Sequence, residues 1–246
     1  MTPASAIIFD LDDTLYPERE YAFSGYRAVS DAFKAILGDA NQSSERLRAL
    51  FDTEFRPRVF NRLLEEYSIS ADADLVRRMV DVFRSHRPTI RLFPDAQRAL
   101  SRLRGAYRLG LITDGPAIMQ RAKIAALKLY EAPAGPSLHH EQSGAIMLDA
   151  IIVTSELGPD YAKPHLHGFE TIAAKLRVAH QLCVYIADNP AKDFVAPNSL
   201  GWLTVRVLRP DGVYAHVTVA PGGEPSFTIH SLDELDAILN AKPKLT

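Results

Sequence analysis

Two aspartates separated by one residue follow directly after a short apolar run near the N-terminus. The run Ile7-Ile8-Phe9 is typical of a buried strand in a parallel sheet, and Asp10 and Asp12 come next. Open α/β sheets bind their ligands at the carboxyl ends of such strands. Carboxylates packed this closely repel each other unless a cation or a proton separates them. The stretch therefore indicates a cation site or, as the simpler alternative, an acidic turn.

Three further stretches place polar residues directly after an apolar run or before a helix. These residues are Thr113, Asp114, Lys163, Asp188 and Asp193. Taken singly, each has an ordinary explanation as a helix cap, a solvated surface charge or a partner of a helix dipole. Taken together, five acids, a threonine and a lysine after strands or before a helix are suited to binding an anion through a cation.

Such a set of groups fits phosphoryl transfer. A phosphate monoester is an anion, so an attacking carboxylate or water meets like-charge repulsion. A divalent cation and a lysine can neutralise part of that charge and hold the phosphate in line. Ligands that are all oxygen favour Mg²⁺ over a softer metal.

Composition limits the other classes of function. The chain has 246 residues and a net charge of −2, so no basic excess points to nucleic acid or to an anionic membrane. Cys183 is the single cysteine, which rules out an internal disulfide, and its apolar surroundings indicate a buried structural thiol. No signal peptide precedes residue 7, and no apolar run reaches membrane-spanning length. We expect a soluble, cytoplasmic protein.

The apolar periodicity changes along the chain and predicts two domains. Residues 17–91 repeat apolar residues at steps of three and four, which predicts an inserted bundle of about four helices, the second of them capped by Ser43 or Ser44. Residues 1–16 and 92–246 alternate strands with helices, which predicts an α/β core with a three-layer, Rossmann-like parallel sheet.

Two segments of the core carry more specific expectations. We expect a helix after Pro116 whose buried face is formed by Ile118, Ala122, Ala125 and Leu129. Residues 131–147 are rich in Pro, Gly, Ser and His and predict a loop, within which His139 and His140 are candidates for substrate contact or for oligomer formation. An exposed apolar face on the insert or in this loop could support a homodimer.

The order of these motifs resembles that of the haloacid dehalogenase superfamily, which consists mostly of phosphatases. Four motifs match in order between residue 7 and about residue 201. The first is Asp-x-Asp-x-Thr after a strand, and the second is a strand that ends in Thr. The third is Lys-Pro, and the fourth is a strand followed by Asp-x4-Asp. The helical insert lies where that superfamily has its first type of cap domain. The resemblance implies a core that carries out the chemistry and a cap that selects the substrate.

The resemblance also assigns a role to each candidate residue. Asp10 would be the nucleophile that forms an aspartyl-phosphate, and Asp12 would act as general acid and then as general base. Asp10, Asp188 and the main-chain carbonyl of Asp12 would hold Mg²⁺. The remaining roles are supporting ones: phosphate binding by Thr113, Asp114 and Lys163, support of the metal site by Asp193, and structural support by Thr14.

Two details separate branches of the superfamily. The dehalogenases lack the second acid, because displacing a halide needs no proton donor, so Asp12 favours phosphate chemistry. Relatives often have Asn where this chain has Asp114. The charge of Asp114 would repel a phosphate, and we therefore expect its side chain to point away and only its main-chain N–H to face the site.

The sequence thus predicts a Mg²⁺-dependent phosphatase that hydrolyses a small phosphomonoester, a sugar phosphate or a nucleotide. The stretch from Asp10 to Glu18 resembles the pyrimidine 5′-nucleotidase branch and slightly favours nucleotides. The alternatives are a phosphomutase or phosphotransferase and, less favoured, a 2-haloacid dehalogenase or a non-catalytic binding protein. Basic residues of the insert could contact a second anionic group of the substrate; they are Arg19, Arg27, Arg56, Arg58 and Arg62.

Overall fold

The structure is a computed structural model that describes residues 4–131 and 145–240. The chain divides into two compact units. The core unit comprises residues 1–17 and 92–246, and the helical unit comprises residues 18–91. The two units are described separately below.

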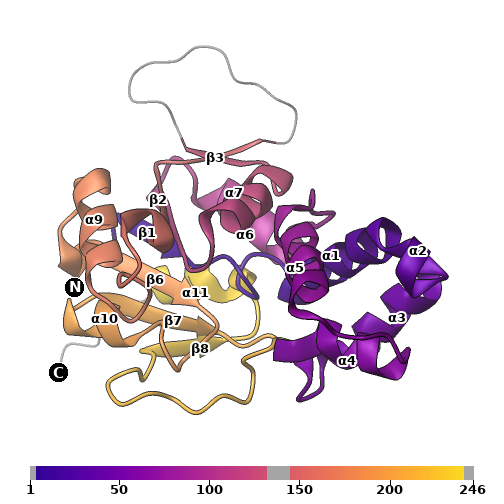
Figure 1. The fold of residues 1–246 in the computed structure, drawn as a ribbon. Helices are drawn as coiled ribbons and strands as arrows, with labels where there is room; N and C mark the ends of the chain where they lie inside the picture. Colours follow the sequence, from indigo (N-terminus) through magenta and orange to yellow (C-terminus); the bar gives the residue numbers. More distant parts are fainter. Residues whose placement is uncertain (1–3, 132–144, 241–246) are drawn as a thin grey trace. The chain divides into compact units, whose positions relative to one another are not determined.

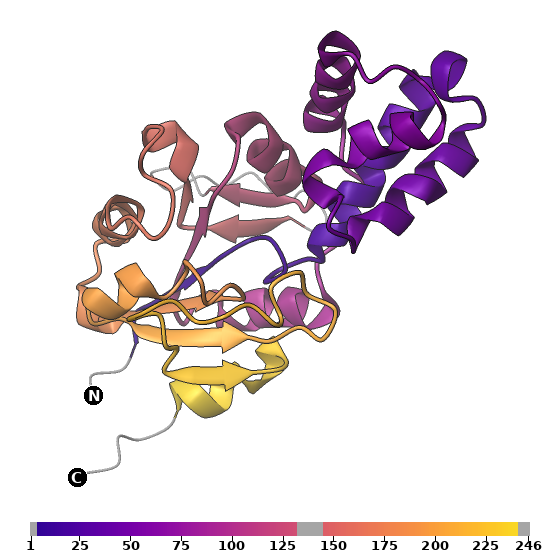
Figure 2. The ribbon, with the colours of Figure 1, turned by 60° about the horizontal axis from the view of Figure 1, so that its bottom comes forward.

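The core unit is built on one six-stranded sheet, which Figures 1 and 2 show flanked by helices. Every neighbouring pair of strands is parallel, in the order β5-β2-β1-β6-β7-β8, so the predicted α/β fold is confirmed. The strands are β1 (Ala6–Phe9), β2 (Arg108–Thr113), β5 (Ala150–Val153), β6 (Cys183–Ala187), β7 (Leu203–Val207) and β8 (Phe227–Ile229).

Helices follow most strands, as parallel pairing requires. Those of the core unit are α6 (Pro94–Leu103), α7 (Ala117–Ala126), α8 (Thr154–Leu157), α9 (His167–Leu176), α10 (Val195–Ser199) and α11 (Leu235–Leu239), with 3₁₀ turns at His180–Leu182 and Leu232–Glu234. No helix among the described residues is both long and apolar enough to span a bilayer.

The central strands are buried on both faces. Ile8, Ile112 and Tyr185 face the side covered by α9, where they join a cluster that includes Phe169. Gly110 on β2 allows this close packing, since a β-carbon there would lie 2.7 Å from Ile172 Cδ1. Burial on both faces explains why these strands appear in the sequence as continuous apolar runs.

Residues 131–147, which we expected to form a loop, include parts of two strands. β3 (Leu129–Glu131) pairs in parallel with β4 (Ile146–Leu148) as a separate two-stranded sheet. The expectation of a loop was therefore wrong at both ends of the segment. His139 and His140 lie outside the described residues.

The helical unit contains α1 (Glu18–Ala32), α2 (Lys34–Leu37), α3 (Ala40–Phe51), α4 (Val59–Glu66) and α5 (Ala73–Ser85), with a 3₁₀ turn at Arg56–Arg58. Aromatic rings fill its interior: the ring centroid of Phe83 lies 5.7 Å from that of Tyr26 and 5.9 Å from that of Phe60. The cap of α3 is Asp39, whose side chain accepts from Gln42 N–H. The prediction of a cap at Ser43 or Ser44 was wrong, because the helix begins a turn earlier.

The chain leaves and re-enters the core unit at adjacent points. The main-chain N–H of Phe93 donates to the carbonyl of Leu15 at 2.9 Å. Both residues belong to the core unit, so the insert begins and ends beside the loop that carries Asp10 and Asp12.

Candidate active site

Parallel pairing brings the predicted residues to one edge of the sheet. Phe9 lies opposite Leu111 on β2 and Ile186 on β6, so the residues that follow these strands are neighbours in space. The main-chain N–H of Asp10 donates to Ile186 O at 2.8 Å and fixes the first of them. Asp10, Thr113 and Asp188 therefore all lie at the carboxyl edge of the three central strands.

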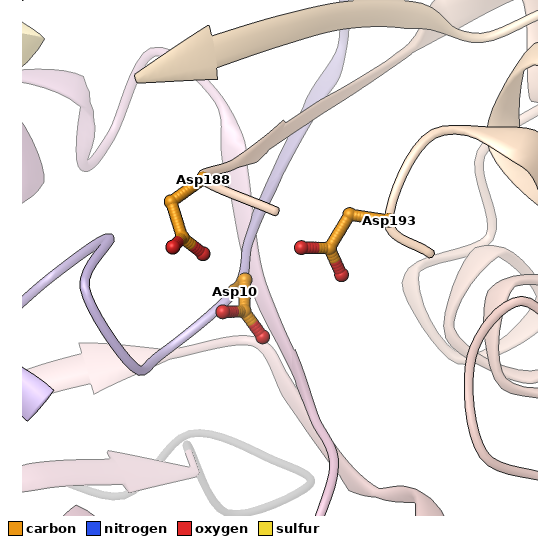
Figure 3. Close-up of side chains that lie close together, drawn as sticks. All are labelled: Asp10, Asp188 and Asp193. Carbon is orange, nitrogen blue, oxygen red and sulfur yellow. The ribbon is translucent and has the colours of Figure 1, made fainter. Parts of the chain in front are cut away.

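Three carboxylates converge at this edge. Asp10, Asp188 and Asp193 are buried, and each offers an oxygen within 4.8 Å of the others; Figure 3 shows the three side chains close together. Lys163 Nζ lies 2.6 Å from an oxygen of Asp10 and 2.6 Å from an oxygen of Asp193. Tyr185 OH accepts a third bond from this ammonium at 3.1 Å. One lysine thus faces three acids.

Burial and the excess of negative charge raise the pKa values of two of these acids. Burial raises the pKa of Asp10 to about 7, with Asp193 adding to the shift and Lys163 opposing it. Burial and the neighbouring Asp193 and Asp10 raise the pKa of Asp188 well above its ordinary value. Burial alone would lower the pKa of Lys163, but Asp10 and Asp193 raise it well above the usual range, so the ammonium stays charged.

The same cluster fits a hard divalent cation. Asp188 Oδ2 is buried without a hydrogen-bond partner among the described residues, which is costly unless another group takes that position. The donor set is entirely oxygen, and its excess negative charge needs a positive partner. Both properties suit Mg²⁺.

Asp12, two residues after Asp10, has a different environment. Its Oδ1 accepts from Lys123 Nζ at 2.7 Å, its Oδ2 accepts from Gln120 Nε2 at 3.0 Å, and Tyr16 OH donates to it as well. Burial alone would raise the pKa of Asp12, but the three donors, chiefly Lys123, lower it below its ordinary value. We call Tyr16, Gln120 and Lys123 the donor cage of Asp12.

None of the three residues of this cage was predicted from the sequence. Gln120 and Lys123 lie on the inner face of α7 with only 1% and 5% of their surface exposed, whereas Ile118 is 60% exposed. The predicted apolar face of this helix was therefore wrong. The signal that could have revealed them is their spacing of three, which puts both polar side chains on one face of a helix that follows a motif strand.

The other predicted residues occupy distinct positions. Thr113 is fully buried, and its hydroxyl accepts from Gln120. Asp114 accepts from Lys192 Nζ at 2.8 Å. The hydroxyl of Thr14 has no hydrogen-bond partner among the described residues, and its carbonyl accepts from Arg209 at 3.1 Å.

The five arginines of the helical unit that could have met a substrate are all paired with acids inside that unit. Their partners are Asp52 for Arg19, Asp31 for Arg27, Glu18 for Arg56, Glu65 for Arg58 and Glu66 for Arg62. The pairs neutralise much of their charge, so the helical unit is less basic than its arginine content implies.

Comparison with known proteins agrees with this geometry. The family model for haloacid dehalogenase-like hydrolases matches residues 4–201. The chain belongs to this family. The match includes the three strand ends that carry Asp10, Thr113 and Asp188, and the turn before α9 that carries Lys163.

Two curated relatives of this hydrolase are named glyceraldehyde 3-phosphate phosphatase. The protein of Methanopyrus kandleri is 28% identical over 83% of this chain and 84% of its own length. The protein of Methanocaldococcus jannaschii is 27% identical over 96% of this chain and 97% of its own. Both comparisons span the helical unit as well as the core.

Solved structures share the fold. The putative hydrolase YfnB of Bacillus subtilis, described as bound to magnesium, superimposes with a TM-score of 0.64 at 20% identity, over 98% of this chain and 100% of its own. At this level of identity the likeness concerns the fold alone.

Proposed function

We propose that this hydrolase cleaves small soluble phosphomonoesters with the help of Mg²⁺, through a phosphorylated Asp10. The observation that carries the proposal is the cluster of Asp10, Asp188 and Asp193 with a single lysine. Its uncompensated negative charge and the unpartnered oxygen of Asp188 call for a cation, and a cation with Lys163 makes the site attractive to a phosphate. The two relatives named as phosphatases support the same reaction.

Asp10, Asp188, Asp193 and the main-chain carbonyl of Asp12 would hold Mg²⁺, which when bound neutralises charge on the phosphoryl group. Lys163 would stabilise the same charge, and it already orients Asp10 through a 2.6 Å contact. Thr113 and the main-chain N–H of Asp114 would contact the phosphoryl oxygens.

The reaction would proceed in two steps. In the first, a carboxylate oxygen of Asp10 bonds to phosphorus, the bond from phosphorus to the ester oxygen breaks, and protonated Asp12 gives that oxygen its proton. In the second, Asp12 removes a proton from water, the water oxygen bonds to phosphorus, and phosphate leaves as Asp10 is restored. The donor cage lowers the pKa of Asp12 and so favours the ionised form that activates water in the second step. The first step uses the protonated form, which the cage makes the minor one.

Glyceraldehyde 3-phosphate is the first substrate to test, because both relatives carry that name. Nucleotides are the second class of substrate to test, because residues 10–18 resemble the corresponding stretch of pyrimidine 5′-nucleotidases. The helical unit would act as the cap that selects among these. Transfer of the phosphoryl group to another hydroxyl is the alternative that the motifs leave open, whereas dehalogenation would leave the proton donor Asp12 unused.

The test is phosphate release with and without Mg²⁺, from p-nitrophenyl phosphate and from a panel of sugar phosphates, nucleotides and glyceraldehyde 3-phosphate. Asp10→Asn keeps the side chain's size and removes the nucleophile, so we expect a loss of about 10⁴-fold or more. Asp236→Asn, an acid on the surface helix α11, is the matched control and should retain activity. Wild-type protein that is inert with every metal and ester, or an equally active Asp10→Asn, contradicts the proposal.

A further inference from the structure

The carboxylate of Asp114 joins three segments that surround the carboxyl end of β2. Its Oδ1 accepts from the hydroxyl of Thr154 at 2.8 Å and from the main-chain N–H of Lys163 at 3.2 Å. Its Oδ2 accepts from Lys192 Nζ at 2.8 Å. The donors come from the start of α8, from the turn that carries Lys163, and from the loop after β6. Both oxygens are thus engaged within the protein.

An acid in this position needs a positive partner if the site is to bind an anion. A negative charge beside a bound phosphate weakens binding unless another group cancels it. Lys192 is the cation whose ammonium contacts Asp114 directly, and its side chain is only one-third exposed. Burial alone would raise the pKa of Asp114, but Lys163 and Lys192 lower it, so the acid is ionised at neutral pH.

Lys163 is held at both ends by different acids. Its ammonium contacts Asp10 and Asp193, while its main-chain N–H is fixed by Asp114. A lysine that must meet a phosphoryl group in the transition state loses its effect when its main chain shifts. The contact from Asp114 therefore bears on catalysis without touching the substrate.

We infer that Asp114 is a positioning residue for Lys163 rather than a phosphate ligand, and that Lys192 neutralises it so that the site keeps its affinity for an anion. The inference rests on the proposed phosphatase function, since it takes this edge of the sheet as the phosphate site. It has two separable parts: the neutralisation of charge by Lys192 and the positioning of Lys163 by Asp114.

The charge part is tested by orthophosphate binding in the presence of Mg²⁺, measured by calorimetry. Lys192→Gln removes the ion pair of Asp114 and should weaken phosphate binding about tenfold, the equivalent of about 1.4 kcal/mol. Asp114→Asn should tighten binding, and the double variant should return to within about threefold of wild type, because both charges are gone. Lys175→Gln, at an exposed lysine paired with Glu131, is the matched control and should bind as wild type does.

A double variant that binds as weakly as Lys192→Gln overturns this part, because Lys192 would then contact the phosphate itself. Failure of the wild type to bind orthophosphate overturns it as well. Thermal unfolding of each variant shows whether weaker binding reflects a damaged fold.

The positioning part is tested by comparing Asp114→Asn with Asp114→Ala in turnover. Asparagine keeps an oxygen that accepts from the N–H of Lys163, so kcat should fall only about threefold, whereas alanine removes the acceptor and should lower kcat about 30-fold. The KM of the alanine variant should change much less than its kcat. Equal losses of kcat in the two variants overturn the positioning role.

The two proposals fail in different ways. If the wild type binds orthophosphate but releases phosphate from no ester, the proposed function is wrong while the charge test still gives its answer. If the wild type is an active phosphatase and the variants fail to follow the pattern above, only the roles of Asp114 and Lys192 are wrong.

Discussion

Asp10 and Asp12 are two residues apart on one loop, yet their surroundings are opposite. Asp10 shares its site with two more acids and one lysine, and its pKa is raised to about 7. Asp12 accepts from three hydrogen-bond donors, and its pKa is lowered. The negative charge around Asp10 exceeds the positive charge that the protein supplies there, so a cation from solution is needed. The charge of Asp12 is already balanced by donors of the protein itself.

The difference shows how one loop can carry two kinds of acid. A nucleophile that works with a metal has to stand among other carboxylates, and the cost of their repulsion is met when the cation binds. A proton carrier needs no metal and is kept in place by fixed donors. Environment rather than residue type separates the two roles.

The largest expected effect tests the role of Asp12. Asp12→Asn should lower the rate with an alkyl ester such as glyceraldehyde 3-phosphate about 10³-fold, and with p-nitrophenyl phosphate only about tenfold, because p-nitrophenolate leaves without a proton. Parallel assays of the two esters measure the difference. Equal losses with both esters would show that Asp12 is not the proton donor.

The donor cage itself is tested by stability. Lys123→Met keeps the length of the side chain but leaves the partly buried carboxylate of Asp12 without its ion pair, which should cost about 2 kcal/mol of the free energy of unfolding in urea. Lys175→Met removes an exposed ion pair and should cost less than about 0.5 kcal/mol. Similar stabilities of the two variants would mean that the cage contributes nothing.

The smallest effect has the opposite sign and concerns Asp188. In protein freed of metal ions by EDTA, Asp188→Asn removes one of three acids that repel one another. The substitution should raise the free energy of unfolding by about 1 kcal/mol near pH 7.5. With excess Mg²⁺ the order should reverse, since only the wild type gains the full stabilisation from the ion. Thermal unfolding in EDTA and in Mg²⁺ gives both numbers, and a variant less stable than wild type in EDTA would refute the repulsion.

The same site gives a dependence on pH. The folded protein raises the pKa values of Asp10 and Asp188, so between about pH 4 and 7 it binds protons that the unfolded chain has released. The free energy of unfolding of the wild-type protein in EDTA should therefore fall as the pH rises from about 4 to 7. Asp188→Asn should make the fall shallower.

The sequence was sufficient for the sheet and its edge because those features are local. Each central strand is a continuous apolar run, and the motif residues follow the runs directly, so parallel pairing alone brings Asp10, Thr113 and Asp188 together. The apolar periodicity of the helical unit was predicted for the same reason, since the buried residues of α1 recur at this spacing.

What the sequence did not reveal depends on contacts between distant segments. Lys123 and Gln120 lie more than a hundred residues from Asp12. Their spacing of three places them on one face of a helix, but it does not identify Asp12 as their partner, and a lysine on a helix is usually solvated. The ion pair of Asp114 with Lys192 is equally remote. In α7, small and apolar residues occur on both faces of the helix. The face that carries Ile118 was expected to be buried, whereas the face that carries Gln120 and Lys123 is the buried one.

The hydrogen bond between Phe93 and Leu15 has a consequence for how such a protein can evolve. Because the insert departs from and returns to neighbouring main-chain atoms, a different folded segment of any length can be spliced between them without altering the register of β1. Residues 18–91 can thus be replaced by another folded segment while Asp10 and Asp12 keep their positions. Under the proposed function, such an exchange would alter the choice of substrate and leave the acids of the core unchanged.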